Sequence, residues 1–284
     1  MRPASRRRPC AAGAPGPSVV GMRIRVIDAF TDRPFAGNPA AVCVLDGPGW
    51  QDAGWMQQVA LEMNLSETAF ARPEPGPDAD WGLRWFTPAV EVRLCGHATL
   101  ATAHALRSDG LLEGGVRFAT RAGTLTAEAA DDGSITLDFP IAPVTPVPAP
   151  EGLAEALGAP LLAVYDTGAL DDIVVEVADV RALRPDFTRL AALTRRGVAV
   201  TAPGSDGFDF LSRFFAPAVG VPEDPVTGSA HTALAALWSA RLGRDELVGL
   251  QASARSGVVR TRVVGDRVLL TGHAVTTLEG TLRC

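Results

Sequence analysis

The chain repeats one order of segments, and this repeat limits the folds that it can adopt. The heptapeptide FTPAVEV begins at Phe86 and FAPAVGV begins at Phe215, and the two share five of seven residues. Each is followed by a short loop, a glycine and an alanine-rich stretch, in LCGHATLATAHAL and VTGSAHTALAALW. The two glycines, Gly96 and Gly228, keep the same place in this order. We therefore interpret the chain as two similar halves that repeat one strand, loop and helix unit.

A proline-rich stretch divides the chain between the two copies of this repeat. The stretch PIAPVTPVPAPEG, 140–152, is too rich in proline to sustain a helix or strand, so we interpret it as a linker. It separates an N-terminal half, 22–139, from a C-terminal half, 153–284, whose last strand is a candidate to return to the first half. The start, 1–21, has the composition of a disordered leader, and Met22 is an alternative to Met1 as the native start.

Turn signals and periodicity predict the elements inside each half. Asp132-Gly133 and Gly265-Asp266 are typical of hairpin turns between two strands. Apolar residues at helical spacing predict a helix over 52–64, and a second short helix is expected over 152–158. Each half is therefore expected to be a mostly β unit wrapped around one helix, which gives an α/β (α+β) fold.

Composition and charge exclude several classes of protein. The formal net charge is −6, and the only arginine cluster is Arg6 to Arg8, so no concentrated basic face is available for nucleic acid. No apolar run approaches the roughly 18 residues of a membrane helix, and the start lacks the apolar centre of an export signal. We expect a globular, cytoplasmic protein with neither nucleic acid nor membrane as a partner.

The reactive side chains exclude further mechanisms. The sequence contains no lysine, which removes pyridoxal-phosphate aldimines, Schiff-base aldolases and P-loop lysines together. The four histidines form no metal-binding motif, and the four cysteines form no CxxC pair and are expected to be reduced. We therefore expect no metal and no cofactor, and a chemistry that depends on side chains alone.

The two predicted helix starts can bind an anion. The first N–H groups of a helix have no intrahelical partner and carry the positive end of its dipole. If the halves face each other, the starts at Gly96 and Gly228 can hold a small anionic metabolite from two sides of one cleft. Ordinary capping by Thr227 and Ser229 explains the second start equally well, so both interpretations stay open.

Several long motifs together resemble one known family. IDAFTDRPFAGNPAAV, EMNLSETAF, RWFTPAVEVRLCGHATLATAHAL and FFAPAVGVPEDPVTGSAHTALAALW are similar to the PhzF family of phenazine-biosynthesis-like isomerases. This resemblance implies the diaminopimelate-epimerase-like fold, with two pseudo-symmetric β-barrel-like domains, each around a central helix, and the active site between them. It also implies a homodimer and a reaction without cofactor.

The resemblance implies roles for particular residues. Glu67 of the NLSET motif is the expected acid/base residue, and partial burial would raise its pKa towards the working pH. His97 and Asp224 match the positions around the substrate, as donor to an oxygen and as orienting carboxylate respectively. Asn38, Gly96, Gly228 and Ser229 are expected to line the same cleft.

Cys95 supports a rival mechanism. A thiol just before a helix start resembles the first catalytic cysteine of two-cysteine racemases and epimerases. The corresponding segment of the other half, EDPVTGSAH, has no cysteine, which disfavours a two-thiol enzyme. We therefore expect an isomerase that moves a proton through Glu67, with a Glu67/Cys95 two-base racemase and a non-catalytic binding protein as alternatives.

Overall fold

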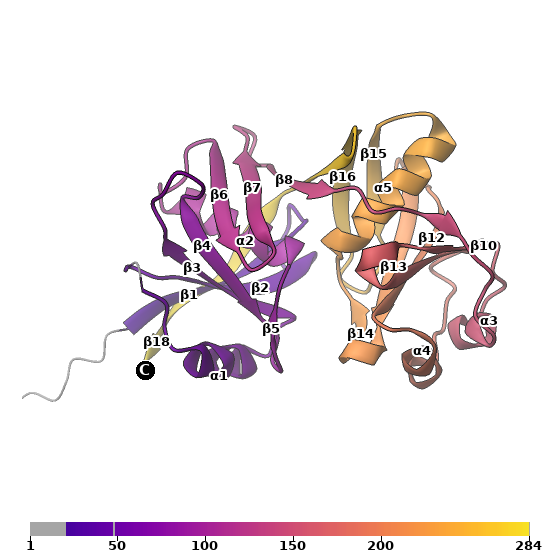
Figure 1. Cartoon of the computed structure of the whole chain (residues 1–284), viewed down its shortest axis with the longest axis horizontal. Helices are drawn as coiled ribbons and strands as arrows, with labels where there is room; N and C mark the ends of the chain where they lie inside the picture. Colours follow the sequence, from indigo (N-terminus) through magenta and orange to yellow (C-terminus); the bar gives the residue numbers. More distant parts are fainter. Residues whose placement is uncertain (1–20, 48, 284) are drawn as a thin grey trace, which may run out of the picture.

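The computed structural model describes residues 21–47 and 49–283, which form two lobes side by side (Figure 1). The leader predicted over 1–21 lies outside the described residues, apart from Gly21 at the beginning of the first strand. Within the described part of the chain, no helix is both long enough and apolar enough to cross a membrane.

The first lobe is a curved sheet around one central helix. Its elements are β1 (Gly21–Ala29), β2 (Asn38–Val44), α1 (Ala53–Met63), β3 (Glu67–Pro73), β4 (Trp81–Phe86), β5 (Glu91–Val92), α2 (Gly96–Ser108), β6 (Gly115–Thr120), β7 (Gly123–Ala129), β8 (Ile135–Pro140) and the C-terminal β18 (Ala274–Arg283).

The second lobe contains the middle of the chain and most of its C-terminal part. Its elements are β9 (Thr145–Pro146), α3 (Leu153–Leu157), β10 (Ala163–Asp166), the 3-10 turn η1 (Gly168–Leu170), β11 (Asp172–Glu176), α4 (Phe187–Leu193), β12 (Gly197–Pro203), β13 (Phe210–Ala216), the 3-10 turn η2 (Pro217–Val219), β14 (Val221–Asp224), α5 (Gly228–Leu242), β15 (Glu246–Gln251), β16 (Gly257–Val264) and β17 (Arg267–Gly272).

The strand pairings of the two lobes follow the same pattern. In the first lobe β2 pairs with β3 in parallel and β4 with β6 in parallel, while β3 and β4 are antiparallel. In the second lobe β11 and β12, then β13 and β15, form the parallel pairs, and β12 and β13 the antiparallel one. The sequence repeat therefore corresponds to a repeated topology.

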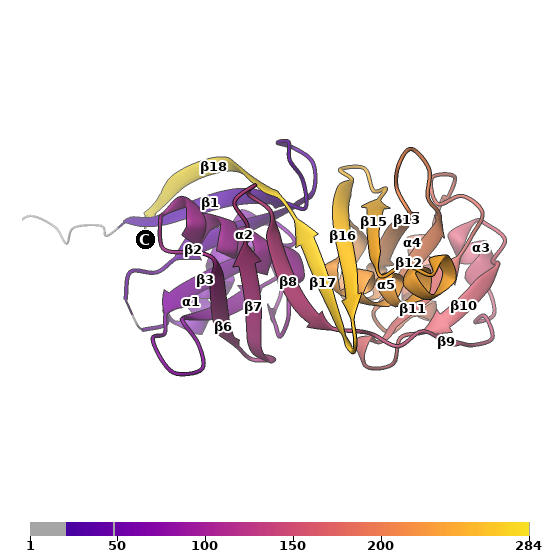
Figure 2. The ribbon, with the colours of Figure 1, turned by 90° about the horizontal axis from the view of Figure 1, so that it is seen from above.

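The two lobes are joined by strands that cross between them. β8 pairs antiparallel with β17, which makes one continuous sheet (Figure 2). β18 returns to the first lobe and pairs with β1, and β9 takes the equivalent place beside β10. Thr145 and Pro146 thus form a short strand inside the stretch that was expected to be only a linker.

Each lobe encloses an alanine-rich helix that is buried on most sides. Nine of the thirteen residues of α2 and ten of the fifteen of α5 are buried. Small side chains let the surrounding strands pack closely, and alanine and leucine have high helix propensity. α5 ends at Gly243, whose left-handed φ of 63° suits glycine. Each lobe therefore faces the other with the start of its central helix, α2 or α5, and not with the side of that helix.

Candidate active site

Glu67 is the first residue of β3, just after the turn that follows α1. Asn64 ends α1 in a left-handed conformation, with a φ of 49°. The chain then enters β3 parallel to β2, with Glu67 beside Ala40. The side chain of Glu67 keeps 19 % of its exposure. It therefore lies at the margin of the core, within reach of a ligand.

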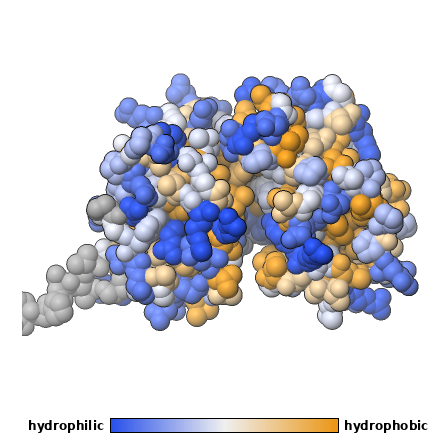
Figure 3. Space-filling model, viewed as in Figure 1, coloured by the Kyte–Doolittle hydropathy of each residue, from blue (hydrophilic) through white to orange (hydrophobic). Residues whose placement is uncertain are grey.

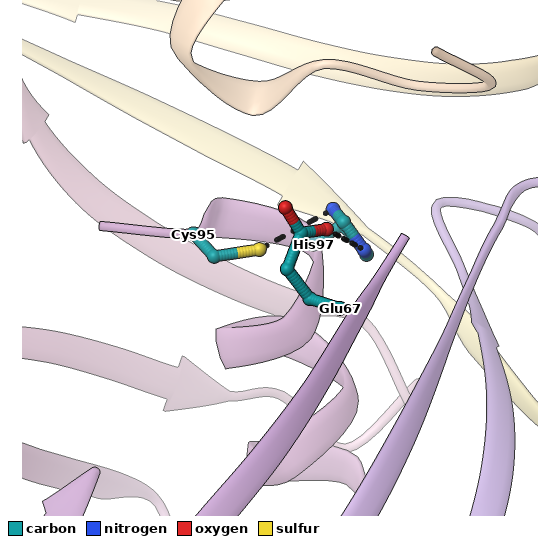
Figure 4. Close-up of side chains that lie close together, drawn as sticks. All are labelled: Glu67, Cys95 and His97. Carbon is teal, nitrogen blue, oxygen red and sulfur yellow. Dashed lines mark hydrogen bonds and ion pairs between the residues drawn. The ribbon is translucent and has the colours of Figure 1, made fainter. Parts of the chain in front are cut away.

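Two side chains at the start of α2 reach Glu67, as Figure 4 shows. Cys95 is the N-cap residue and His97 is the second residue of the helix. His97 Nε2 lies 3.2 Å from Glu67 Oε2. Cys95 Sγ lies 3.5 Å from His97 Nδ1 and within 4.8 Å of a carboxylate oxygen of Glu67. The fold thus brings together three residues that the sequence singled out, namely Glu67, His97 and Cys95.

Asn38, at the beginning of β2, connects this cluster to the second lobe. Its Nδ2 lies 3.2 Å from His97 Nδ1 and donates to Asp224 Oδ1 at 2.8 Å and to the Val226 carbonyl at 2.9 Å. The two hydrogens of Asn38 Nδ2 are used by the shorter contacts with Asp224 and Val226, whereas the Cys95 thiol can donate to His97 Nδ1. We therefore assign Nδ1 as an acceptor and place the ring hydrogen on Nε2.

Two buried polar atoms of this cluster have no hydrogen-bond partner within residues 21–47 and 49–283. One is Asn38 Oδ1, and the other is His97 Nε2, whose contact with Glu67 has a suitable distance but not hydrogen-bond geometry. The two residues are 0 % and 5 % exposed. An unsatisfied buried polar group costs about 1–3 kcal/mol, so a ligand that pairs with these atoms binds more tightly.

Asp224, the last residue of β14, is held by neighbours in both lobes. The Thr227 hydroxyl and the Asn38 amide each donate to its carboxylate. Gln251 Nε2 donates to the Asp224 carbonyl at 2.7 Å, while Gln251 Oε1 accepts from the Thr227 N–H at 2.8 Å. Asp224 therefore has a fixed orientation before any ligand binds.

The two central helices meet start to start. A methyl group placed on Gly96 would lie 3.5 Å from the Cα of Gly228, and the converse distance is also 3.5 Å. The N-cap residues, Cys95 and Thr227, make no side-chain capping hydrogen bond. Capping by Thr227, the alternative left open by the sequence, is thus not observed. The space-filling view shows a groove between the two lobes (Figure 3).

Ser229, the second residue of α5, has a neighbour that the motifs did not indicate. Its Oγ accepts a hydrogen bond from Arg196 Nη2 at 2.8 Å. Arg196 also pairs with Asp172, a buried residue at the beginning of β11. Ser229 therefore lies at the helix start as expected, and its hydroxyl hydrogen is left for a ligand.

Burial dominates the electrostatics of the site. Burial, together with the charge of Asp224, raises the pKa of Glu67 to about 8. Burial likewise raises the pKa of Asp224 to about 6 and that of Cys95 well above its usual value. Burial lowers the pKa of His97 to about 3, so this imidazole is neutral at pH 7. At neutral pH the site holds a protonated thiol, a neutral imidazole and a carboxyl group close to its pKa.

Glu67, Cys95 and His97 offer one set of donor atoms for a metal ion. One donor atom from each lies within 4.8 Å of the others, and carboxylate, thiolate and imidazole are ligands that Zn²⁺ accepts. Binding would require the loss of two protons, because Glu67 and Cys95 both have raised pKa values. The donor set exists, but its protonation state at neutral pH opposes a cation.

Sequence analysis missed Arg196 and Gln251. Gln251 is buried in β15 and fixes Asp224 and Thr227 through the contacts given above. Arg196 precedes β12, and it reaches the α5 start because β12 contacts that helix, as in the hydrogen bond from Trp238 to Thr201. Neither residue belongs to a recognisable motif. The register of the repeat was the only signal in the sequence that pointed to the segment around Arg196.

Comparisons with known proteins agree on one family. A sequence model described as phenazine biosynthesis-like protein, PhzC-PhzF, matches residues 27–280. An uncharacterized isomerase of Pseudomonas aeruginosa is 51 % identical over 268 residues, which cover 92 % of this chain and 98 % of that protein. Another uncharacterized isomerase, from Halalkalibacterium halodurans, is 45 % identical and covers 91 % of this chain and 97 % of its own length.

A solved structure shows the same similarity. The crystal structure of a phenazine biosynthesis protein of the PhzF family from Enterococcus faecalis superimposes with a TM-score of 0.87 at 37 % sequence identity. The match covers 93 % of this chain and 100 % of that chain. The similarity thus extends over both lobes and includes the site between them.

Proposed function

Because the chain belongs to the phenazine biosynthesis-like (PhzC-PhzF) family, we propose that it is a cofactor-independent isomerase that moves a proton within a small metabolite carrying a carboxylate group. The family and the diaminopimelate-epimerase-like fold expected from the motifs are confirmed, and the two relatives described above are named isomerases. The reaction, the residue roles and the absence of a cofactor are our proposals.

The observation that carries the proposal is the contact between Glu67 and the unpaired His97 Nε2 beside two uncapped helix starts. A carboxyl group with a pKa of about 8 exchanges protons readily near neutral pH. The neutral imidazole donates without adding a charge, and the helix starts favour an anion. Together these groups suit the removal of a proton next to a carboxylate.

The proposed reaction begins with Glu67 ionised. Its carboxylate takes a proton from a carbon of the bound acid, and the electron pair of the broken C–H bond is delocalised towards an oxygen that accepts a hydrogen bond from His97 Nε2. Glu67 then returns the proton to another carbon of the same molecule, and the double bond shifts. The proton is conserved, and no oxidant or reductant is consumed.

A two-base mechanism through Cys95 is the second candidate, because Cys95 Sγ lies within 4.8 Å of a carboxylate oxygen of Glu67. Both residues come from the first lobe, however, and they approach one point from neighbouring elements (Figure 4). A racemase needs acid/base groups on opposite faces of its substrate. The residue in the second lobe that corresponds to Cys95 is Thr227, which has no group able to act as a base at neutral pH.

Solvent isotope exchange tests the proposal directly. Small carboxylic acids with an acidic C–H bond are incubated with the protein in D2O, and mass spectrometry follows the uptake of deuterium. The Glu67→Gln variant should exchange about 10²–10⁴-fold more slowly, since it keeps the shape of the carboxylate but cannot accept a proton. The matched control is Glu62→Gln, at an exposed position of α1.

Two results would contradict the proposal. One is normal exchange by Glu67→Gln, and the other is loss of exchange after treatment with EDTA, which would indicate a metal at Glu67, Cys95 and His97. An acid that binds but exchanges with neither parent nor variant would favour the binding-protein alternative. The homodimer and the cytoplasmic location expected from the sequence stay predictions.

A further inference from the structure

Arg196 is fixed in one orientation at the start of α5. One nitrogen, Nη1, pairs with the Asp172 carboxylate, and the other, Nη2, donates to Ser229 Oγ at 2.8 Å. The guanidinium lies over the Phe214 ring, 5.5 Å from its centroid. Contacts on two edges and one face restrict the rotamers of a long side chain, so little conformational entropy is lost when it binds a ligand.

The fixed guanidinium is still open to solvent. The Asp172 side chain that holds it is 1 % exposed, whereas the Arg196 side chain is 36 % exposed. A buried carboxylate thus anchors Nη1, while the Arg196 side chain as a whole stays partly exposed. This arrangement differs from that of a cation whose only role is to neutralise a buried acid.

Arg196 lies near the candidate active site. Its positive charge favours the ionised forms of both Glu67 in the first lobe and Asp224 in the second, and lowers the pKa of each. Ser229, its hydrogen-bond partner, follows Gly228, where the two helix starts meet. Arg196 therefore lies beside the point at which the anion is proposed to bind.

The repeat shows which residue of the first lobe corresponds to Arg196. Thr68 pairs with Phe86 in the first lobe, and Val198 pairs with Phe215 in the second, so these strands are in the same register. Arg196 therefore occupies the position that Ser66 has in the first lobe, directly before the counterpart of Glu67. The two segments offer an acid/base group on one side and a cation on the other.

We propose that Arg196 anchors the carboxylate of the substrate, with Ser229 Oγ and the first N–H groups of α5, and so makes the site selective for carboxylic acids over their neutral analogues. This inference rests on the proposed function, since it names the group that holds the substrate while Glu67 moves the proton. The planar fork of a guanidinium matches the two oxygens of a carboxylate, and such charge-assisted pairs are strong.

Binding of inert probes tests the anchor separately from catalysis. Benzoate and pyrrole-2-carboxylate are compared with benzamide and pyrrole-2-carboxamide by isothermal titration calorimetry. Each pair differs only in the anionic group, and no turnover is needed. The parent protein should prefer the acids by about 10- to 100-fold, the range for a charge-assisted hydrogen bond. Arg196→Gln should remove most of this preference, and Arg196→Lys should restore part of it.

Arg195→Gln is the matched control. Arg195 is the adjacent residue, its side chain is 88 % exposed, and the substitution removes the same charge from the surface. It should leave the preference for acids unchanged. If Arg195→Gln and Arg196→Gln lost the preference for acids equally, the preference would depend on net charge alone, and the proposal would be overturned.

The remaining outcomes also decide the question. An unchanged preference in Arg196→Gln, or a parent protein that binds neither acid at millimolar concentration, would overturn the anchor. Glu67→Gln should keep the full preference whether or not Glu67 moves a proton. Failure of the isotope exchange with an intact preference for acids would therefore contradict the proposed function and leave the anchor standing.

Discussion

The starts of α2 and α5 are built on the same framework but carry different functional groups. Each begins with a glycine, and each is preceded by a strand whose arginine forms a double hydrogen bond to a glutamate. Arg84 pairs with Glu91, and Arg213 pairs with Glu223, at N···O distances of 2.7–2.9 Å. Arg84 also lies over Phe86, and Arg213 over Phe215. The repeat therefore extends to side-chain geometry.

The functional side chains do not follow the repeat. Where the first lobe has Cys95 and His97, the second has Thr227 and Ser229. Glu67 begins β3, whereas its counterpart at the beginning of β12 is a glycine, preceded by Arg196. The two lobes therefore share a fold but carry different functional groups. This arrangement suits a substrate that is held by the second lobe and deprotonated by the first. Four predictions test this comparison.

The largest expected effect concerns the burial of Glu67. Its pKa is raised from 4.5 to about 8, so its favourable contribution to stability is complete below pH 4.5 and is lost as the pH rises through 8. At about 1.4 kcal/mol per pKa unit, and reduced for the remaining exposure of the side chain, the loss is about 3 kcal/mol. Urea unfolding of the parent and of Glu67→Gln should show this difference growing between pH 5 and pH 9. A constant difference would mean that Glu67 is solvated.

The paired arginine–glutamate contacts should contribute equally in both lobes. Glu91→Gln and Glu223→Gln each remove the charge and replace one acceptor oxygen of a largely buried double hydrogen bond by an NH2 group, and each should lower the free energy of unfolding by about 2 kcal/mol. Glu91 also pairs with Arg121, but that side chain is 58 % exposed, so this contact adds little. Urea denaturation at pH 7 measures this, with Glu128→Gln at an exposed position as control. A large difference between the two losses of unfolding free energy would show that the two arginine–glutamate contacts are not equivalent.

The corresponding residues His97 and Ser229 should differ in ligand binding. His97→Ala removes a buried donor without a protein partner and should weaken benzoate binding about tenfold, whereas Ser229→Ala should weaken it about threefold because Arg196 remains. Calorimetry on variants with unchanged circular dichroism gives both numbers. A reversed order would mean that the Ser229 hydroxyl contributes more to anion binding than the His97 imidazole does.

The smallest effect is expected at the N-cap positions. Cys95→Ser keeps a hydroxyl donor beside Glu67, so deuterium exchange should stay within about threefold of the parent, as it should for Thr227→Ser. Exchange rates in D2O provide the measurement. Complete loss in Cys95→Ser, with benzoate binding intact, would instead support the two-base racemase and make the first lobe the source of both bases.

Local sequence signals predicted the elements where they were strong. The helices expected over 52–64 and 152–158 appear as α1 and α3, and the hairpins at Asp132-Gly133 and Gly265-Asp266 connect β7 to β8 and β16 to β17. The short strand β9 was missed, because Thr145 and Pro146 gain their strand pairing only from β10. The α4 helix, Phe187–Leu193, was also missed.

The sequence by itself determined the repeat, the family and the residues that carry its motifs, because these depend on the order and identity of amino acids. The positions of Arg196 and Gln251 beside the site, and the contact of Asn38 with Asp224 across the lobes, were decided by the tertiary structure. The protonation states were decided there as well. A carboxyl group has a pKa near 4.5 in any exposed segment, and only the low-polarity surroundings formed by strands distant in sequence raise that of Glu67 to about 8.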